Sequence, residues 1–220
     1  MRFVVLVEGD TERRMLGCLL GCWLNKEDRL ATRIGVHTES VDGCPATAPE
    51  TVRRARRHLA AVKESDVIAV AALSDWYTPQ QGLLRDMPKG TTDPIAWAAS
   101  ELERRADLGP RFRAFFAVHD IEAWLWSQPD VFPRGVAAAV GADKRGPEEV
   151  DENSPPSQRL KALYRERCDK GYMKTVHGPS LFQKLDAELA YAKCPHLAEM
   201  LDWMLEKARA AGLSPPPHTS

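Results

Sequence analysis

The first half of the chain alternates short apolar runs with segments of helical periodicity, and this alternation constrains the fold more than any other feature. Residues 3–7 form a short apolar run rich in β-branched side chains and residues 67–73 are fully apolar, as buried strands are, and residues 34–41 and 112–118 read as further strands. Helical segments separate these runs, and strands that are apolar on both faces need cover on both sides of their sheet. The sequence therefore predicts an α/β fold with a four-stranded, mainly parallel sheet and flanking helices.

The pattern changes after residue 128. Residues 143–156 are charged and contain prolines and glycines, which is typical of a linker or an exposed loop. Helical patterns follow over residues 157–168, 180–192 and 195–211, and the Pro-rich end of the chain is expected to be disordered. We expect a first domain over residues 1–128, a helical C-terminal extension over residues 129–211 and a disordered tail over residues 212–220.

The charge balance selects no class of partner. Thirty Lys and Arg residues stand against 31 Asp and Glu residues, which gives a formal net charge of −1. The distribution of charge is more informative than its sum, and basic segments lie over residues 53–63 and 159–174. Each segment is equally well interpreted as a solvated helix face or as a phosphate-binding surface.

The cysteines and the N-terminus predict a cytoplasmic protein. The five cysteines are an odd number without a regular framework, and acidic residues follow the N-terminal apolar run at once, unlike in a signal peptide. No apolar run approaches the ~20 residues of a membrane span. Cys18 and Cys22 lie four residues apart on a predicted helix; we interpret them as small buried side chains, with a metal-binding pair as the alternative.

Acidic residues follow three of the four predicted strands. Glu8 follows the first strand, Asp75 the third, and Asp120 and Glu122 the fourth. Ligands gather at the carboxyl ends of the strands in an open parallel sheet, so these side chains are expected to lie close together. Such a cluster suits Mg²⁺, which prefers oxygen ligands, and would support phosphodiester cleavage. The alternative is that the acids cap the following helices, a role that suits Asp10 and Asp120 better than Glu8.

The motifs resemble those of a known family. Val-Glu-Gly-Asp-Thr-Glu at residues 7–12 resembles the opening motif of Toprim domains, the fold shared by topoisomerases, primases and OLD-family nucleases. More closely, the chain up to about residue 207 is similar to a bacterial domain-of-unknown-function family of Toprim-like proteins, often encoded beside an ABC, RecF or OLD-like ATPase. That similarity rests on six motifs in order, at residues 7–12, 75–77, 119–126, 154–160, 172–179 and 194–205.

The resemblance implies a Toprim-like fold, dependence on Mg²⁺ or Mn²⁺, and nuclease chemistry in anti-phage defence with an ATPase partner. Glu8 would be the catalytic or metal-binding glutamate, and Asp75 the first acid of the second motif. The chain departs from the Toprim pattern at Tyr77, where Toprim enzymes have a second Asp, and a phenol is not a Mg²⁺ ligand at neutral pH. Either Asp120 and Glu122 complete the ligand set, which we favour, or the site binds a nucleotide or polynucleotide without cutting it.

Further residues are assigned to the same site. Glu12, one helical turn beyond the first glutamate, is expected to support that ligand or to hold a second metal. His119 either orients the scissile phosphate or is a satisfied histidine at a strand end. Arg159, Lys174 and His177 are expected to contact phosphate, the last two from beside a Gly-Pro turn, and Lys174 to take part in catalysis.

Two main functions follow from this sequence. The first is a metal-dependent nuclease acting on DNA or RNA, with Glu8, Asp75 and Glu122 holding the metal and Asp120 as an additional ligand. The second is a degenerate Toprim-like subunit that binds an ATPase and nucleic acid or nucleotide without cleaving it, which the near-neutral charge mildly favours. A third is a structural role in which the acids only cap helices, and a homo-oligomer is compatible with each.

Overall fold

The fold is built on a parallel sheet, as predicted. The computed structural model describes residues 1–41, 49–60, 66–76, 85–149, 154–168 and 170–215. Four strands of these residues pair in the order β2-β1-β3-β4, and every pairing is parallel. The strands are β1 (Arg2–Val7), β2 (Gly35–Ser40), β3 (Val67–Asp75) and β4 (Phe112–Ala117). The α/β fold with a four-stranded parallel sheet and flanking helices is therefore confirmed.

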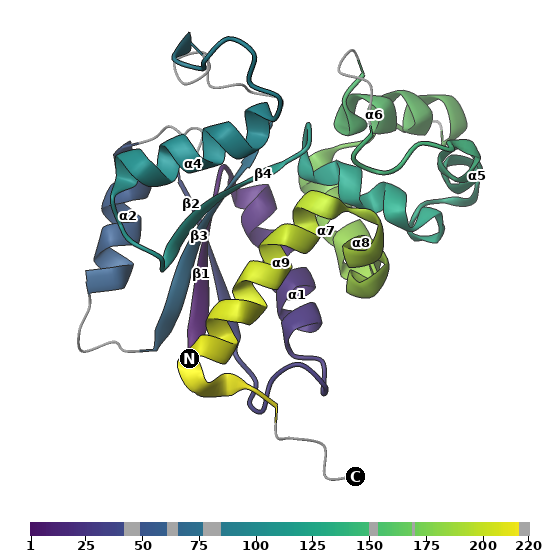
Figure 1. Cartoon of the computed structure of the whole chain (residues 1–220). Helices are drawn as coiled ribbons and strands as arrows, with labels where there is room; N and C mark the ends of the chain where they lie inside the picture. Colours follow the sequence, from purple (N-terminus) through teal and green to yellow (C-terminus); the bar gives the residue numbers. More distant parts are fainter. Residues whose placement is uncertain (42–48, 61–65, 77–84, 150–153, 169, 216–220) are drawn as a thin grey trace.

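Helices cover both faces of the sheet (Figure 1). The covering helices are α1 (Asp10–Leu24), α2 (Pro49–Ala60), α4 (Pro94–Ala106) and α9 (Pro195–Ala208). Val4 and Leu6 of β1 lie in a core with residues of α2 and α4, whereas Phe3 and Val5 lie in the core formed with α1 and α9. Successive side chains of a strand point to opposite faces, so a strand buried on both sides must be apolar at every position.

The remaining helices form the part of the chain that Figure 1 draws to one side of the sheet. They are η1 (Ile121–Ser127), η2 (Pro129–Val131), α5 (Arg134–Ala142), α6 (Pro156–Arg167), α7 (Lys174–Lys184) and α8 (Ala187–Lys193), whereas η3 (Arg209–Leu213) continues α9 at its end near the N-terminus. They differ from the sequence-based expectation in two ways. The helix expected over residues 180–192 is replaced by the end of α7 and by α8, and α5 lies in a stretch where no helix was expected.

Helix α7 corrects the position predicted for its residues. It begins at Lys174 and runs through Pro179, so Lys174 and His177 lie on a helix and not beside a Gly-Pro turn. The reason is tertiary packing of α7 on α1. A Cβ atom added to Gly178 would lie 2.7 Å from the Met15 Sδ atom, so the glycine allows the two helices to approach closely.

Helix α1 contradicts two expectations. Asp10 does not cap it: Gly9 occupies the N-cap position, and Asp10 pairs with Arg13 from the first turn. Cys18 and Cys22 are exposed, with their sulfur atoms 3.7 Å apart, because the buried stripe of the helix is formed by larger apolar residues. An acidic residue in the first turn still favours the helix through its dipole.

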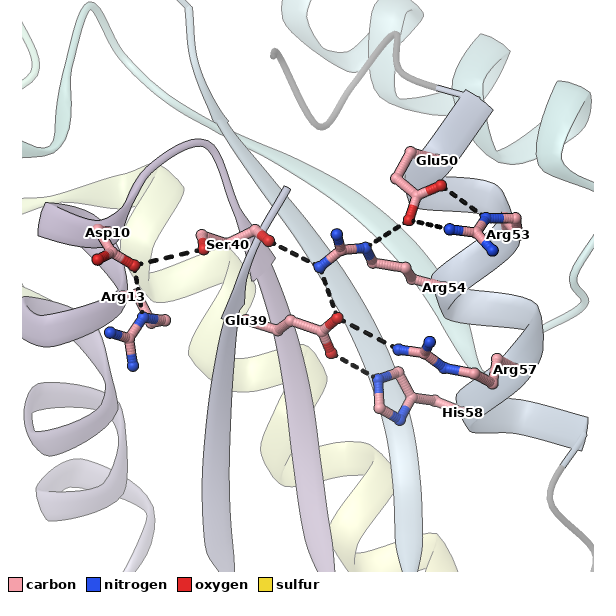
Figure 2. Close-up of polar contacts among 9 residues, drawn as sticks. All are labelled: Asp10, Arg13, Glu39, Ser40, Glu50, Arg53, Arg54, Arg57 and His58. Carbon is pink, nitrogen blue, oxygen red and sulfur yellow. Dashed lines mark hydrogen bonds and ion pairs between the residues drawn. The ribbon is translucent and has the colours of Figure 1, made fainter. Parts of the chain in front are cut away.

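The basic residues of α2 are largely paired with acids (Figure 2). Arg54 contacts both Glu39 of β2 and Glu50, at 2.7 Å each, and Arg53 contacts Glu50 at 2.6 Å. His58 and Arg57 also reach Glu39 (Figure 2). These pairs tie α2 to the edge of the sheet. The described part of the basic segment 53–63 is therefore mostly engaged within the protein, in agreement with the structural interpretation of its charge.

No helix among the described residues is long and apolar enough to cross a membrane. The four cysteines of the described residues, Cys18, Cys22, Cys168 and Cys194, are free thiols.

Candidate metal-binding carboxylate site

The carboxyl ends of three neighbouring strands carry the acidic residues. Glu8 follows β1, Asp75 ends β3, and Asp120 follows β4 after a short turn. Strand β3 pairs with β1 on one side and with β4 on the other, so the three ends lie side by side. This is the edge of a parallel sheet where ligands usually bind.

The side chain of Lys174 lies among these acids. Its Nζ atom is 2.7 Å from Glu12 Oε1, 3.0 Å from Glu122 Oε2 and 3.8 Å from Asp75 Oδ2. Lys174 is the first residue of α7, and the close packing of α7 on α1 brings it there. The structure thus brings together Glu12, Asp75 and Glu122 around one ammonium group.

Glu8 lies at the margin of this group. It is half-buried; burial raises the pKa of its carboxyl group, the nearby charge of Glu12 adds to the rise, and Lys174 opposes it. The Glu12 carboxylate lies against the backbone of Gly9. A side chain at this position would prevent that approach, because a Cβ atom at Gly9 would lie 2.8 Å from Glu12 Oε2. The Glu-Gly dipeptide therefore leaves room for a second carboxylate beside the first.

The acids at the ends of β3 and β4 are held in a buried setting. Burial raises the pKa of Asp75 well above its usual range, although Lys174 opposes the rise. Burial also raises the pKa of Glu122 to about 7, and that side chain has no exposed surface. The pKa of Asp120 is raised by burial as well, against a hydrogen bond from Ser157. Carboxylates that are hard to ionise without a cation are typical of functional sites.

A strained turn orients the last two acids. His119 is buried and adopts φ 65°, in the left-handed region that few non-glycine residues occupy. The turn is closed by Asp120, whose backbone N–H donates to the Val118 carbonyl oxygen at 3.0 Å. Backbone strain of this kind persists only where the surroundings over-determine it, and it is concentrated at functional sites.

One carboxylate oxygen of the site is buried without a partner among the described residues, and a second has a single cationic partner. Asp120 Oδ2 accepts from the Ser157 backbone N–H at 3.1 Å, whereas Asp120 Oδ1 is buried without a partner. Glu122 Oε1 accepts from the Tyr172 hydroxyl at 3.4 Å, and Glu122 Oε2 has only the ion pair with Lys174. Buried oxygens left in this way are costly unless a cation or a donor satisfies them.

These residues fit a hard divalent cation in their chemistry. Every candidate ligand is a carboxylate, the group that Mg²⁺ and Mn²⁺ prefer, and the buried Asp120 Oδ1 atom has no partner among the described residues. No group of three or more His, Cys, Asp or Glu side chains in the described parts of the chain is arranged to hold a metal ion, and the Lys174 ammonium group lies between Glu12, Asp75 and Glu122. A cation would therefore have to replace the ammonium group.

The predicted phosphate contacts are distributed differently. The Arg159 guanidinium pairs with Asp143 at 2.6 Å and lies 5.7 Å from the centre of the Trp126 ring, so these partners lie outside the group around Lys174, and its predicted contact with phosphate stays a prediction. His177 stacks on Tyr172, and its Nδ1 atom accepts from the Met173 N–H at 2.9 Å. Lys174 alone of the three contacts the acids. Tyr77 lies outside the described residues.

Tyr172 is a residue of the site that sequence reasoning missed. It lies within the motif at residues 172–179 and is buried, and its hydroxyl contacts Glu122. In the sequence, a tyrosine two residues before Lys174 is only a weak indication that it belongs to the carboxylate site. Its role became visible only when the turn before α7 brought it over η1.

The raised pKa of Glu122 predicts how stability varies with pH. A carboxyl group whose pKa is about 7 in the folded protein, against 4.5 ordinarily, contributes stability below pH 4.5 that is lost as the pH rises through 7. We expect the metal-free protein to become less stable from pH 5 to pH 8, and Glu122→Gln to remove roughly 2–3 kcal/mol of that loss. Urea unfolding at both pH values measures this, with the exposed Glu27→Gln as control. Equal pH slopes in Glu122→Gln and the wild type would contradict it.

The fold and the site define an α/β protein with an acidic site at the carboxyl ends of three parallel strands. The chain belongs to the family described as Domain of unknown function (DUF4276), whose profile matches residues 7–205. The matched span contains all six motifs on which the sequence resemblance rests, and the predicted membership of a domain-of-unknown-function family is confirmed.

Solved structures give more distant likenesses. The C-terminal region of the Xanthomonas campestris pv. campestris OLD protein is 18% identical, with a TM-score of 0.46; the match covers 95% of this chain and 94% of that one. The C-terminal region of the Burkholderia pseudomallei OLD protein is 17% identical, with a TM-score of 0.49 and coverage of 94% and 98%. Comparison with curated protein sequences gives no match.

Proposed function

We propose that this protein is a divalent-metal-dependent nuclease that hydrolyses phosphodiester bonds in DNA or RNA. The observation that carries the proposal is the gathering of Glu12, Asp75 and Glu122 around one cation at the carboxyl ends of adjacent strands. A helix cap needs one acid at one helix end, so capping does not account for carboxylates from three different elements in contact with the same ammonium group. Charge neutralisation by a cation does.

Glu8, Asp75 and Glu122 would hold Mg²⁺ or Mn²⁺, with Asp120 and Glu12 as additional ligands. The unpartnered Asp120 Oδ1 and the sparsely partnered Glu122 Oε2 are the atoms that most need such a cation. When bound, the metal supplies an activated water and neutralises the charge that develops on the phosphate. The acids themselves fix the position of that cation, because burial and the strained His119 turn restrict their side chains.

Lys174 has a separate part in the proposal. Without metal it neutralises the acids; with their charge satisfied, its flexible four-carbon side chain is free to turn toward a phosphate. Placed within a few ångströms of the scissile group, an ammonium stabilises the charge that grows in the transition state. His119, buried beside Asp120, would orient either that carboxylate or the phosphate.

The proposal extends to the setting in which the site works. We propose a cytoplasmic effector that acts with an ABC, RecF or OLD-like ATPase in anti-phage defence, as the six motifs together imply by their resemblance. The ATPase would control when nucleic acid reaches the acids. The near-neutral net charge of −1 is consistent with a subunit that depends on a partner for much of its affinity for nucleic acid.

A second candidate function is binding without cleavage. The position of Lys174 favours it, because an ammonium paired with three carboxylates at 2.7–3.8 Å resembles a permanent structural ion cluster. In that case the acids hold α7 against the sheet, and the protein serves as a nucleic-acid-binding or nucleotide-binding subunit of an ATPase. The two candidates differ in one measurable property, which is turnover.

The cleavage assay distinguishes them. Labelled single-stranded DNA, duplex DNA and RNA are incubated with the protein in Mn²⁺, Mg²⁺ or EDTA, and products are separated by length. We expect cleavage of at least one substrate in Mn²⁺ and none in EDTA, because the acids need a cation to act on phosphate. Binding of these substrates without cleavage in either metal would exclude the nuclease and leave the second candidate.

A further inference from the structure

A cavity lies in the helical part of the chain, separate from the carboxylates. Its volume is about 380 Å³, it is open to solvent on one side, and it is bordered by the segment that follows η1, the end of α6 and one face of α7. We call it the α6–α7 pocket. Lys170, His177 and Lys184 line it, with Leu181 and Phe132 among the apolar side chains of its wall. This volume is within the range of pockets that bind small organic molecules.

The charge of the α6–α7 pocket selects an anionic ligand. Lys170 and Lys184 are exposed, and no ion pair is formed by either of them within the described part of the chain. Asp130 is the one acidic residue among the lining side chains of the described chain. Two ammonium groups beside an apolar wall suit a ligand that carries phosphate on an apolar or sugar body.

Helix α7 connects this pocket with the carboxylate site. Lys174 contacts the acids from the first turn, while His177, Leu181 and Lys184 line the pocket at spacings of three and four residues, which place them along one helix face. Ten residues separate Lys174 from Lys184, about 15 Å at ~1.5 Å of rise per residue. Tyr172 is also shared, because it contacts Glu122 and stacks on His177.

We propose that the α6–α7 pocket binds a sugar-phosphate unit of a single-stranded polynucleotide, a few nucleotides away from the phosphodiester bond at the carboxylates. The inference rests on the proposed function and names its substrate form. A concave pocket of this volume admits one unit of a flexible strand, whereas the units of a rigid duplex stay paired and stacked and do not enter a pocket singly. Lys170 and Lys184 contact phosphates of the strand, and the apolar wall contacts its sugars.

The test uses the binding of a fluorescein-labelled oligothymidylate, measured by fluorescence anisotropy in EDTA so that no cleavage occurs. The variant Lys170→Ala/Lys184→Ala is compared with Lys144→Ala/Lys161→Ala, which removes two exposed lysines that do not line the pocket. We expect the pocket variant to bind at least tenfold more weakly. The slope of log affinity against log salt concentration should be smaller in magnitude by about 1.4 for the pocket variant. Each phosphate contact on a single strand contributes about 0.7 to that slope, and the variant removes two contacts.

The control variant should bind nearly as the wild type does, and an unlabelled duplex should compete less well than an unlabelled single strand. Three results would overturn the proposal that the pocket binds the strand. They are wild-type affinity in the pocket variant, equal weakening of binding in both variants, and no binding by the wild type. Cleavage in Mn²⁺ is measured separately. Cleavage by a pocket variant with unchanged affinity refutes the pocket and leaves the nuclease, whereas pocket-dependent binding without cleavage refutes the nuclease and leaves the pocket.

Discussion

Replacing Lys174 by methionine is expected to destabilise the metal-free protein and to tighten its binding of Mn²⁺. Burial opposes the charge of Lys174, but the carboxylates of Glu122, Asp75 and Glu12 outweigh this and raise its pKa above the usual range. The group is therefore charged at neutral pH, and its removal leaves buried acids without a counter-ion. Breaking a buried ion pair on one side costs roughly 3 kcal/mol or more, which is about 6–12 °C in Tm for a chain of this size.

The opposite effect on metal binding has the same cause. In the wild type a cation must displace the ammonium group from the acids, whereas in Lys174→Met the acids are ready to bind it. We expect the dissociation constant for Mn²⁺, measured by calorimetry, to fall at least tenfold, and saturating Mn²⁺ to restore most of the lost stability. The exposed Lys161→Met is the matched control. Weaker or unchanged Mn²⁺ binding by Lys174→Met would show that the ammonium and the metal do not compete.

Replacing Asp75 by asparagine is expected to abolish cleavage while leaving the fold intact. Asp75 is the last residue of β3, the strand between β1 and β4, so it stands at the centre of the acidic site. The amide has almost the same shape as the carboxyl group but carries no charge, and its loss from a metal site should lower the single-turnover rate by about 10³-fold. The metal-free variant should be at least as stable as the wild type, because burial already disfavours the charge of Asp75.

The matched control for Asp75→Asn is Asp10→Asn. Asp10 is an exposed carboxylate on α1 that pairs with Arg13, two residues from Glu8 but outside the group around Lys174. The substitution Asp10→Asn removes one negative charge from the same region of the protein. Comparable loss of cleavage in Asp10→Asn would indicate a general electrostatic effect, and undiminished cleavage in Asp75→Asn would remove Asp75 from the site.

The sequence predicted the sheet and its acidic ends because these depend on local patterns. A central parallel strand such as β3 must be apolar at each position, and its last residue, Asp75, marks where the burial ends. Glu8 and Asp120 follow their strands for the same reason. The sequence did not predict which strands are neighbours, because the order β2-β1-β3-β4 depends on how the helices pack on the two faces of the sheet.

Lys174 shows why the rest could not be predicted. Local signals at Gly178 and Pro179 favour a turn, yet the helix runs through both because α1 lies close enough to require a glycine there. Only that contact directs Lys174 to the acids. Arg159 was assigned to phosphate on its charge and its place near a turn, and neither signal indicated that a carboxylate 16 residues earlier in the chain, Asp143, pairs with it. Contacts between distant segments decide which charges meet, and a single sequence does not contain them.

The central claim is that the carboxylates at the ends of β1, β3 and β4 bind one divalent cation, and Mn²⁺ binding tests it most directly. Free Mn²⁺ is titrated against the protein and followed by its electron paramagnetic resonance signal, for the wild type and for Glu8→Gln/Asp75→Asn. We predict that the wild type removes at least one Mn²⁺ per chain from solution at micromolar to millimolar concentrations and that the double variant removes none at this site. Equal uptake by the two proteins would contradict the claim.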